Sequence, residues 1–344
     1  MKRPTVQMHE PSPEELIRVA GLLREARSWT LFSHKKADGD TLGSASALFE
    51  AGLLAGKRVT WHGPDESIPP AYRFLAHSES CVPCGDTFDF NDPEELYIFL
   101  DCANDGRSVE GLEAGAGGIR VLNIDHHEDN TRFGTVNCVA PRSSSTSELL
   151  FRILKAGDWP MSRSLAQSIY VGIWTDSGGF SFSNTSPRTH LLAAELMELG
   201  VEPDIVDDEL NQTRTPEGMM LWSRALSHLH VFGEEKMFAL AWLSREDFDA
   251  SGAHPSDTEG LSGSLMKIRG VRMAAFLTEQ EPEKVKASFR SRGGVFPAAE
   301  AARFFGGGGH PRAAGATLAM PLSQALEEVQ KFFEERHAEW TSAH

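Results

Sequence analysis

The sequence lacks any long hydrophobic run. Although 40% of its 344 residues are apolar, the longest purely apolar stretches, such as residues 237–243, fall well short of the roughly 20 residues that cross a bilayer. The opening residues, MKRPTVQMHEP, contain no hydrophobic signal core. Charged residues make up 24% of the chain, as in soluble globular proteins, so we expect a cytoplasmic location and no membrane partner.

Cysteine is also scarce. The four cysteines, Cys81, Cys84, Cys102 and Cys138, are too few and too scattered to form a disulfide framework. Cys81 and Cys84 form a lone CxxC pair, and a second pair that would complete a zinc site is missing. We interpret these two thiols as incidental residues of a polar loop.

Positive charge is in deficit, with 33 Lys and Arg against 49 Asp and Glu and a net charge of −16. This balance argues against a protein that coats nucleic acid by long-range attraction. A nucleotide substrate is still compatible with the acidic total, because acids gathered to hold divalent cations make a site locally positive once it is loaded.

The chain is long enough for about two domains. In the first part, apolar strands with little alternation are separated by helices, which indicates a parallel α/β sheet with helices on both faces. We expect strands at residues 29–33, 58–61, 96–101 and 119–125, and helices at residues 13–27, 41–56, 69–76, 145–157 and 162–174.

The pattern changes after about residue 190. A polar stretch that looks helical and connecting is followed by strand-like runs at residues 237–243, 272–280 and 284–291, with EQEPEK as a hairpin turn between the last two. A glycine run and a terminal helix from Ser323 complete the chain. These patterns predict a second, smaller α+β domain joined to the first by a helical linker.

Three of the expected strands in the first part are followed by residues that bind metals. His34 follows the first strand, Asp101 the third, and Asp125, His126 and His127 the fourth. Because ligands bind at the carboxyl ends of strands in a doubly wound sheet, we expect these side chains to converge at one edge.

Two further motifs supply aspartates. In HKKADGD, Asp38 and Asp40 flank a glycine that lets the loop wrap an ion, and Asp40 or Thr41 is suited to cap the next helix. In WTDSGGF, Asp176 follows an apolar helix. Each motif alone is compatible with an ordinary turn, but the combined set of histidines and aspartates favours a metal site.

Adjacent side chains in an extended segment point in different directions, so His126 and His127 are not expected to bind one ion in the same way. One is suited to hold metal while the other faces substrate. An oxygen-rich site with few imidazoles suits Mn²⁺ or Mg²⁺, and the histidines favour Mn²⁺. Two such ions, about 3.5–4 Å apart, would activate water for an in-line displacement at phosphorus.

The motifs HKKADGD, FLDCAN, NIDHHEDN and WTDSGGF, followed by GGGGH, resemble those of the DHH/DHHA1 phosphoesterase superfamily, and within it the nanoRNase (oligoribonuclease) and 3′-phosphoadenosine 5′-phosphate (pAp) phosphatase group. The resemblance extends over residues 31–316. It implies a DHH catalytic domain at residues 1–195, a helical linker at residues 196–230 and a DHHA1 substrate-binding domain at residues 231–344. SSSTSE and FSFSNT also resemble this group, without an assigned contact for each residue.

The resemblance also implies two Mn²⁺ ions, with Mg²⁺ as a substitute. Their ligands would be His34 and Asp38 for one ion, Asp40, His126 and Asp176 for the other, and Asp101 as the bridge between them. His127 would lie beside the scissile phosphate, and Asp125 would orient the histidines.

The glycine run FFGGGGHPR leaves backbone N–H groups able to approach an anion closely. A flexible linker is the alternative, but the flanking apolar residues favour a structured loop. The resemblance implies that this loop and the preceding strand bind the substrate's phosphate through Arg290, Ser291, Gly308, Gly309 and His310. From the sequence alone, the arginines of this strand are equally typical of a solvated edge.

We therefore expect a Mn²⁺-dependent phosphoesterase that degrades short RNA oligonucleotides to 5′-mononucleotides and, as a second activity, converts pAp to AMP. Linear and cyclic dinucleotides such as pApA and cyclic di-AMP are alternative substrates, and a nucleotide-binding sensor is the non-enzymatic alternative. A homodimer is left open. The GGGGH motif speaks against a family II pyrophosphatase, and the chain length speaks against a long-substrate exonuclease with an added nucleic-acid-binding domain.

Overall fold

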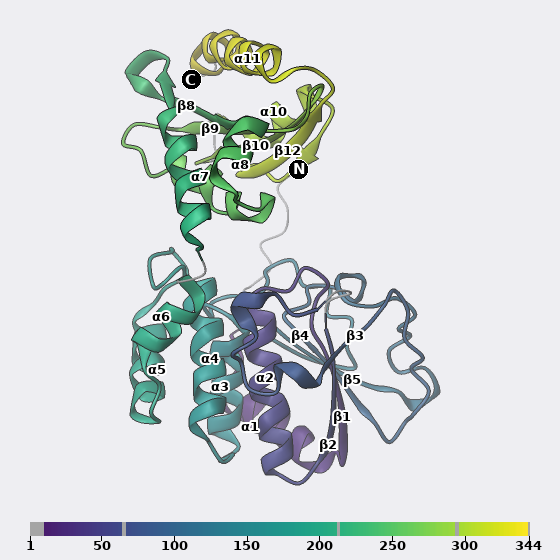
Figure 1. Ribbon diagram of the computed structural model, residues 1–344. Helices are drawn as coiled ribbons and strands as arrows, with labels where there is room; N and C mark the ends of the chain where they lie inside the picture. The colour runs from purple at the N-terminus through teal and green to yellow at the C-terminus, as the bar shows by residue number, and fades with distance from the viewer. Residues whose placement is uncertain (1–9, 64–66, 212–213, 293–295, 343–344) are drawn as a thin grey trace. The chain divides into compact units, whose positions relative to one another are not determined.

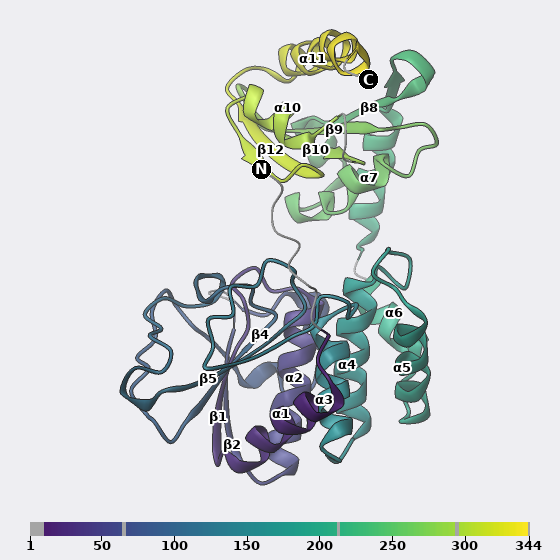
Figure 2. The ribbon, with the colours of Figure 1, turned by 180° about the vertical axis from the view of Figure 1, so that it is seen from behind.

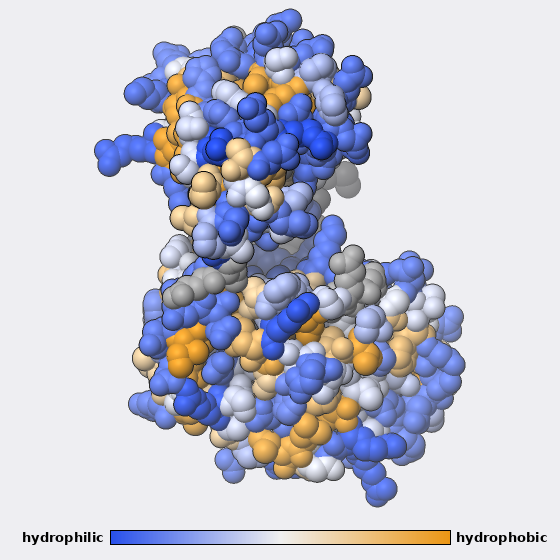
Figure 3. All heavy atoms as spheres, viewed as in Figure 1, coloured by the Kyte–Doolittle hydropathy of each residue, from blue (hydrophilic) through white to orange (hydrophobic). Residues whose placement is uncertain are grey.

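The computed structural model describes residues 10–63, 67–211, 214–292 and 296–342. The chain divides into two compact units, Met1–Thr213 and Arg214–His344, each with its own sheet (Figure 1). Among the described residues, no helix is both long enough and apolar enough to cross a membrane. On the face shown in Figure 3 hydrophilic residues predominate, and the apolar side chains form separate patches.

The first unit is built on a six-stranded sheet in which every pairing is parallel. In spatial order the strands are β3 (Cys81–Pro83), β2 (Arg58–Gly63), β1 (Ser28–Phe32), β4 (Leu96–Leu100), β5 (Arg120–Asp125) and β6 (Val136–Val139). The α/β prediction is confirmed, and the four expected strands correspond to β1, β2, β4 and β5. β3 and β6 were not predicted because they are short and carry Pro83 and Asn137 rather than an apolar run.

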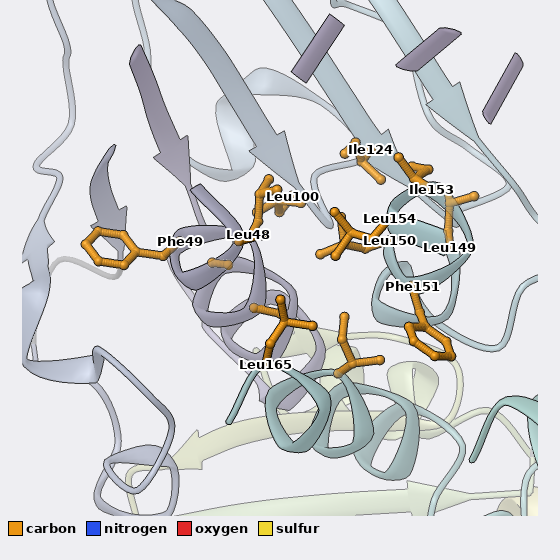
Figure 4. Packing of buried hydrophobic residues seen from close by; sticks show 14 of the residues in the cluster. Leu48, Phe49, Leu100, Ile124, Leu149, Leu150, Phe151, Ile153, Leu154 and Leu165 are labelled. Atoms are coloured by element: carbon orange, nitrogen blue, oxygen red, sulfur yellow. The ribbon is translucent and has the colours of Figure 1, made fainter. Parts of the chain in front are cut away.

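The α-helices of this unit cover one face of the sheet (Figure 1). They are α1 (Pro13–Glu25), α2 (Gly39–Leu54), α3 (Thr146–Ala156), α4 (Arg163–Asp176), α5 (Pro187–Glu198) and α6 (Pro203–Asn211). Leu100 and Ile124 of the sheet belong to the same buried cluster as Leu150 and Leu154 of α3 (Figure 4). The helix expected at residues 69–76 is reduced to a single 3-10 turn, Pro70–Tyr72.

The opposite face of the sheet is covered differently from what we expected. Phe88 and Phe90, from the chain between β3 and β4, pack against Phe32 and Phe99. Among the described residues, the segment that follows β4 contributes only 3-10 turns here, without an α-helix. The buried strands predicted that both faces of the sheet are covered, but not which elements cover them. The expectation of helices on both faces is therefore corrected: helices cover one face, and loops cover the other (Figure 2).

The CxxC segment is also placed differently from our interpretation. Cys81 does not lie in a polar loop but begins the edge strand β3, where it pairs with Trp61 of β2. Cys84 follows the strand, and both side chains are half-buried. Burial raises the pKa of Cys81 to about 12, so this thiol is not a reactive one.

The second unit contains a mixed sheet and confirms the α+β expectation. In spatial order its strands are β11 (Gly308–Gly309), β12 (Ala313–Leu318), β10 (Lys284–Ser291), β9 (Met273–Glu281), β8 (Phe238–Leu243) and β7 (His230–Phe232). β8 and β9 are parallel and the other pairs antiparallel. The predicted hairpin turn joins β9 to β10.

Both faces of this second sheet carry helices. α10 (Ala298–Phe304) and α11 (Leu322–Ser342) pack on one face, where Phe289, Val329 and Phe333 are buried together. α7 (Pro216–Ser227), α8 (Arg245–Ser251) and α9 (Leu261–Leu265) pack against β8 and β9 from the other. On that side, Lys286 of β10 and Gly315 and Thr317 of β12 are exposed.

Candidate metal centre

The carboxyl ends of the strands in the first unit bring the predicted ligands together. His34 follows β1, Asp101 follows β4 and His126 follows β5, while Asp40 lies in the first turn of α2 and Asp176 ends α4. Among the described residues, the ligand atoms form three overlapping groups, each within 4.8 Å. The first group is His34, Asp38 and Asp101, and the second group is Asp40, His126 and Asp176. A third group, Asp101, His126 and His127, connects them, because Nε2 of His126 and Nδ1 of His127 each lie 3.6 Å from Asp101 Oδ1.

The start of α2 shapes the loop that carries three of these residues. Asp38, rather than the expected Asp40 or Thr41, is the N-cap, since its Oδ1 accepts from the N–H groups of Asp40 and Thr41 at 3.1 and 3.2 Å. Its other oxygen is left facing His34. Gly39 is required because a Cβ there would lie 2.5 Å from Cγ2 of Thr175.

In the first group, the His34 ring is 3% exposed and its Nε2 lies 3.7 Å from Asp38 Oδ2 and 3.4 Å from Asp101 Oδ2. Among the residues that the structure describes, neither ring nitrogen has a hydrogen-bond partner. Burial lowers the pKa of His34, but the carboxylates of Asp101 and Asp38 outweigh it and raise the pKa to about 9. A buried imidazole without a hydrogen bond that faces two carboxylates fits a metal ligand, because such groups are otherwise costly.

In the second group, Nε2 of His126 lies 3.5 Å from Asp176 Oδ2, 3.6 Å from Asp101 Oδ1 and 3.9 Å from Asp40 Oδ2. These separations are too long for direct hydrogen bonds. Ligand atoms that each lie about 2.1 Å from one ion are separated by about 3–4 Å, so the group also fits a divalent cation.

Asp101 lies between the two groups. Its Oδ2 faces His34 and its Oδ1 faces His126. The residue has a φ of 62°, a left-handed conformation that is rare for aspartate and costs free energy. Its N–H donates to the carbonyl of Ile124 at 3.1 Å, which fixes the turn after β4 against β5. The strained backbone holds one carboxylate where both groups meet it.

The aspartates of the site carry a concentration of negative charge. Burial, followed by the charge of Asp101, raises the pKa of Asp40 well above its usual range. Burial also raises the pKa of Asp176 to about 6, against the opposing effect of His126. Ionised carboxylates are therefore unfavourable here without compensating positive charge, which divalent cations would supply.

The second histidine of the pair has different partners. The two rings are inclined by 62°, as expected for adjacent residues with separate roles. His127 Nδ1 lies 2.8 Å from Oδ1 of the buried Asp125, whose hydrogen bond raises the pKa of His127 against the effect of burial. On the other side of the ring, Arg107 Nη1 donates to Nε2 at 3.2 Å. Nδ1 of His127 therefore carries the proton, and Nε2 accepts.

Several contacts at the site were not predicted. Besides Arg107, Asn130 donates to Asp125 Oδ2 at 2.5 Å, Thr146 Oγ1 donates to Asp101 Oδ1 at 3.0 Å, and Asn184 donates to the carbonyl of Asp176 at 3.0 Å. Thr146 and Asn184 lie in the SSSTSE and FSFSNT motifs, which were the available signal. Arg107 lies in a 3-10 turn with no comparable pattern.

In the second unit, most of the predicted phosphate-binding residues lie near one end of the sheet. Gly308 and Gly309 form β11, His310 donates through its N–H to the Ala313 carbonyl at 2.9 Å, and Ala313 lies opposite Arg290 in the register of β12 and β10. Ser291 is separate. It is buried, and its hydroxyl donates to the carbonyl of Phe296.

The glycine run is a structured loop, not a flexible linker. Gly306 and Gly309 have φ values of +77° and +140°, and a Cβ on Gly307 would lie 2.7 Å from Cα of Ala316. Gly308 differs, because a Cβ there would meet no atom within 4 Å. The fold thus accounts for three of the glycines and leaves an open approach at the fourth.

Comparison with known proteins agrees with this arrangement. Residues 29–173 match the DHH family, N-terminal domain, and residues 236–339 match the DHHA1 domain. The chain is 33% identical over 324 residues to the bifunctional oligoribonuclease and PAP phosphatase NrnA of Thermus thermophilus, which covers 93% of this chain and 94% of that protein. The Bacillus subtilis protein of the same name is 27% identical over 301 residues, covering 84% and 88%.

A solved structure shares the fold. An exopolyphosphatase-related protein from Bacteroides fragilis superimposes with a TM-score of 0.77 at 24% sequence identity. The superposition covers 94% of this chain and 97% of that one. Both units therefore occur together in a protein of known structure.

Proposed function

The chain belongs to the DHH/DHHA1 phosphoesterase family, and from this premise we propose that it hydrolyses short RNA oligonucleotides to 5′-mononucleotides with the aid of two Mn²⁺ ions. The observation that carries the proposal is the pair of ligand groups that meet at Asp101. A purely nucleotide-binding sensor would have no use for a shared carboxylate between two ion sites. The names of the two NrnA relatives support both the RNA substrate and pAp as a second one.

The donor set favours manganese. Each group offers one imidazole nitrogen and two or three carboxylate oxygens, which suits Mn²⁺ and accepts Mg²⁺ as a substitute. Bound there, two such ions would lower the pKa of a bound water and stabilise the charge of an in-line displacement at phosphorus. His34 and Asp38 would hold one ion, Asp40, His126 and Asp176 the other, and Asp101 would contact both.

His127 and Arg107 supply the remaining chemistry of the site. Asp125 fixes the ring of His127 so that Nε2 is presented on the side of Arg107. We assign Arg107 to an equatorial oxygen of the scissile phosphate, since a guanidinium binds phosphate through paired hydrogen bonds. When Arg107 engages phosphate, Nε2 of His127 is free to take up a proton and pass it to the leaving oxygen.

We assign the catalytic role to residues 1–195 and substrate binding to residues 231–344, joined by a linker at residues 196–230. In the substrate-binding part, Arg290 and the loop Gly308, Gly309 and His310 would hold a terminal phosphate. Gly308 supports this assignment, because no neighbouring atom requires a glycine there and a phosphate oxygen has room to approach its backbone. We place the activity in the cytoplasm, where short RNA fragments arise.

The test is an assay of the purified protein with Mn²⁺ on end-labelled RNA of two to five nucleotides, on pAp, and on linear pApA and cyclic di-AMP. We expect release of 5′-mononucleotides from the RNA series and AMP from pAp. Faster turnover of cyclic di-AMP or pApA than of every RNA substrate would favour the dinucleotide phosphodiesterase. Nucleotide binding without turnover of any substrate would overturn the proposed enzyme in favour of the sensor.

A further inference from the structure

One short segment, residues 143–147, which ends the connection from β6 and begins α3, reaches the ligands of the second group. The N–H of Thr146 donates to Asp40 Oδ2 at 2.7 Å, and the N–H of Ser147 donates to Asp40 Oδ1 at 2.9 Å. These are N–H groups of the first turn of α3, which have no partner within the helix. The start of α3 thus fixes both oxygens of a completely buried carboxylate.

The same segment contacts the other members of the group. The carbonyl of Ser143 lies 3.3 Å from Nδ1 of His126, the ring nitrogen that faces away from the carboxylates. Asn184 donates both to the Ser144 carbonyl at 2.8 Å and to the Asp176 carbonyl at 3.0 Å. Every ligand of the second group is therefore held by this segment, directly or through one amide.

The contact between residues 143–147 and the shared carboxylate of Asp101 also favours the second group. Asp101 accepts the hydroxyl of Thr146 through Oδ1, the oxygen that faces His126. Its Oδ2 faces His34, and no bond from residues 143–147 to that oxygen is found among the described residues. Within Asp101 itself, the support is on the side of the second group.

The first group has much less support. Neither ring nitrogen of His34 has a hydrogen-bond partner, and 55% of the Asp38 side chain is exposed. Asp38 is held by the two N–H groups that it caps at the start of α2. In the part of the chain that the structure describes, residues 143–147 make no hydrogen bond to either residue.

An ion pair between buried Glu148 and partly exposed Arg188 anchors the segment. Glu148 is 0% exposed, and its Oε2 accepts from the hydroxyls of Ser144 at 2.7 Å and Thr189 at 2.8 Å. Its Oε1 accepts from Arg188 Nε at 2.8 Å, and Arg188 also donates to the carbonyl of Arg142 at 3.0 Å. Glu148 and Arg188 together fix both ends of the segment to α5.

We propose that Glu148 and Arg188 are positioning residues for one metal ion only, so that the ion of Asp40, His126 and Asp176 binds more tightly than the ion of His34 and Asp38. The reasoning is that partners which orient the ligands change metal affinity by about 10–100-fold, and only the second group has such a set. The inference rests on the proposed two-ion centre. It adds an order of binding, in which the second group fills first.

The experiment is a titration of metal-free protein with Mn²⁺. Binding is measured by calorimetry and, independently, by the paramagnetic signal of free Mn²⁺. The unmodified protein should show two classes of site. Arg188→Gln and Glu148→Gln should weaken the tighter class about 10–100-fold, with a much smaller effect on the weaker class. Arg188→Lys, which keeps a positive charge beside Glu148, should recover part of the loss.

Glu50→Gln is the matched control. Glu50 is also a buried acid of the first unit, and it accepts a hydroxyl bond from Ser164 at 2.6 Å, far along α2 from Asp40. It should leave both classes unchanged. Equal weakening of both classes in the Arg188 variant, or no change in either, would overturn the inference. Fewer than two ions bound by unmodified protein would instead count against the proposed function itself.

Should Glu148→Gln fail to fold, the two Arg188 variants decide the matter, because Arg188 is 37% exposed at its side chain and tolerates substitution more readily. Circular dichroism of each metal-free variant separates loss of fold from loss of metal affinity. A purely structural role would lower the free energy of unfolding without discriminating between the two classes of site.

Discussion

The two units place their functional residues in opposite ways. In the first unit the candidate ligands His34, Asp40 and Asp101 are almost fully buried and lie where strands and helices end. In the second unit Gly308, Gly309 and His310 are exposed on a hairpin. The buried imidazoles and carboxylates of the first unit are held in fixed positions, as metal binding requires, whereas the glycine loop of the second unit leaves its backbone open, as the proposed phosphate binding requires. Substitutions in the first unit should therefore affect turnover, and those in the second should affect substrate affinity.

The largest effect is expected for Asp101→Ala. Because this carboxylate faces both ligand groups, its loss should lower kcat by at least about 10³-fold, the scale of losing electrostatic stabilisation at the reacting centre. Turnover of an RNA trimer in excess Mn²⁺ measures it. Asp129→Ala is the control, since Asp129 is exposed in the same stretch and should be neutral. A variant at Asp101 with unchanged kcat would disprove the bridging role.

His127→Gln should come next. Loss of a proton donor at the leaving oxygen costs about 10²–10⁴-fold in rate. Since we do not count His127 among the metal ligands, the Mn²⁺ content should stay at the unmodified level. Parallel measurement of kcat and of bound Mn²⁺ tests both statements. Loss of one ion together with activity would show that His127 binds metal instead.

In the second unit, Arg290→Ala should raise KM for a dinucleotide by about 10–100-fold with little change in kcat, because a hydrogen bond to a charged group is worth about 1.5–3 kcal/mol. Ser291→Ala is the informative partner. Its buried hydroxyl already donates to the Phe296 carbonyl, so we expect a loss of stability and almost no change in KM. If Ser291→Ala raised KM as much as Arg290→Ala, Ser291 would belong to the phosphate-binding residues.

The smallest effect concerns the pH dependence of the metal-free protein. Burial lowers the pKa of His34, but Asp101 and Asp38 outweigh it and raise the pKa to about 9, above the ordinary 6.5. A group with a raised pKa stabilises the fold fully below its unfolded pKa and loses this contribution as pH rises through its folded pKa. The free energy of unfolding should therefore fall between pH 6.5 and about 9.

Thermal unfolding of the metal-free protein measures this fall, because each kcal/mol of lost free energy of unfolding lowers the Tm by about 2–4 °C. His34→Asn should flatten the profile over that range. Mn²⁺ requires a neutral His34, so stabilisation by Mn²⁺ should grow over the same range. An identical slope in the unmodified protein and in His34→Asn would contradict the assignment.

Much of the candidate metal centre was predictable because its candidate ligands mark the ends of regular elements. An apolar strand followed by His34 or Asp101 is visible in a single sequence, and a parallel sheet brings such ends together. The residues that support the ligands were not predictable in this way. Arg107 meets His127, and Asn184 meets Ser144, across separations in the chain that no local pattern encodes.

The fold shows the same division between local and distant information. β1, β4 and β5 were expected because each contains a mainly apolar run of strand length, while β3 and β6 are short edge strands whose pairing depends on their neighbours. The covering of the second sheet face by Phe88 and Phe90 depends on how a long connection folds back. The direction of Ser291 follows from alternation along β10, which places it opposite to Arg290.

The most direct test of the account is the rate of RNA trimer hydrolysis measured against the number of Mn²⁺ ions bound per chain, as metal-free protein is titrated with Mn²⁺. We expect almost no turnover with the first ion, which fills the group of Asp40, His126 and Asp176, and full turnover only as the second ion binds. Full turnover with one bound ion per chain would contradict it.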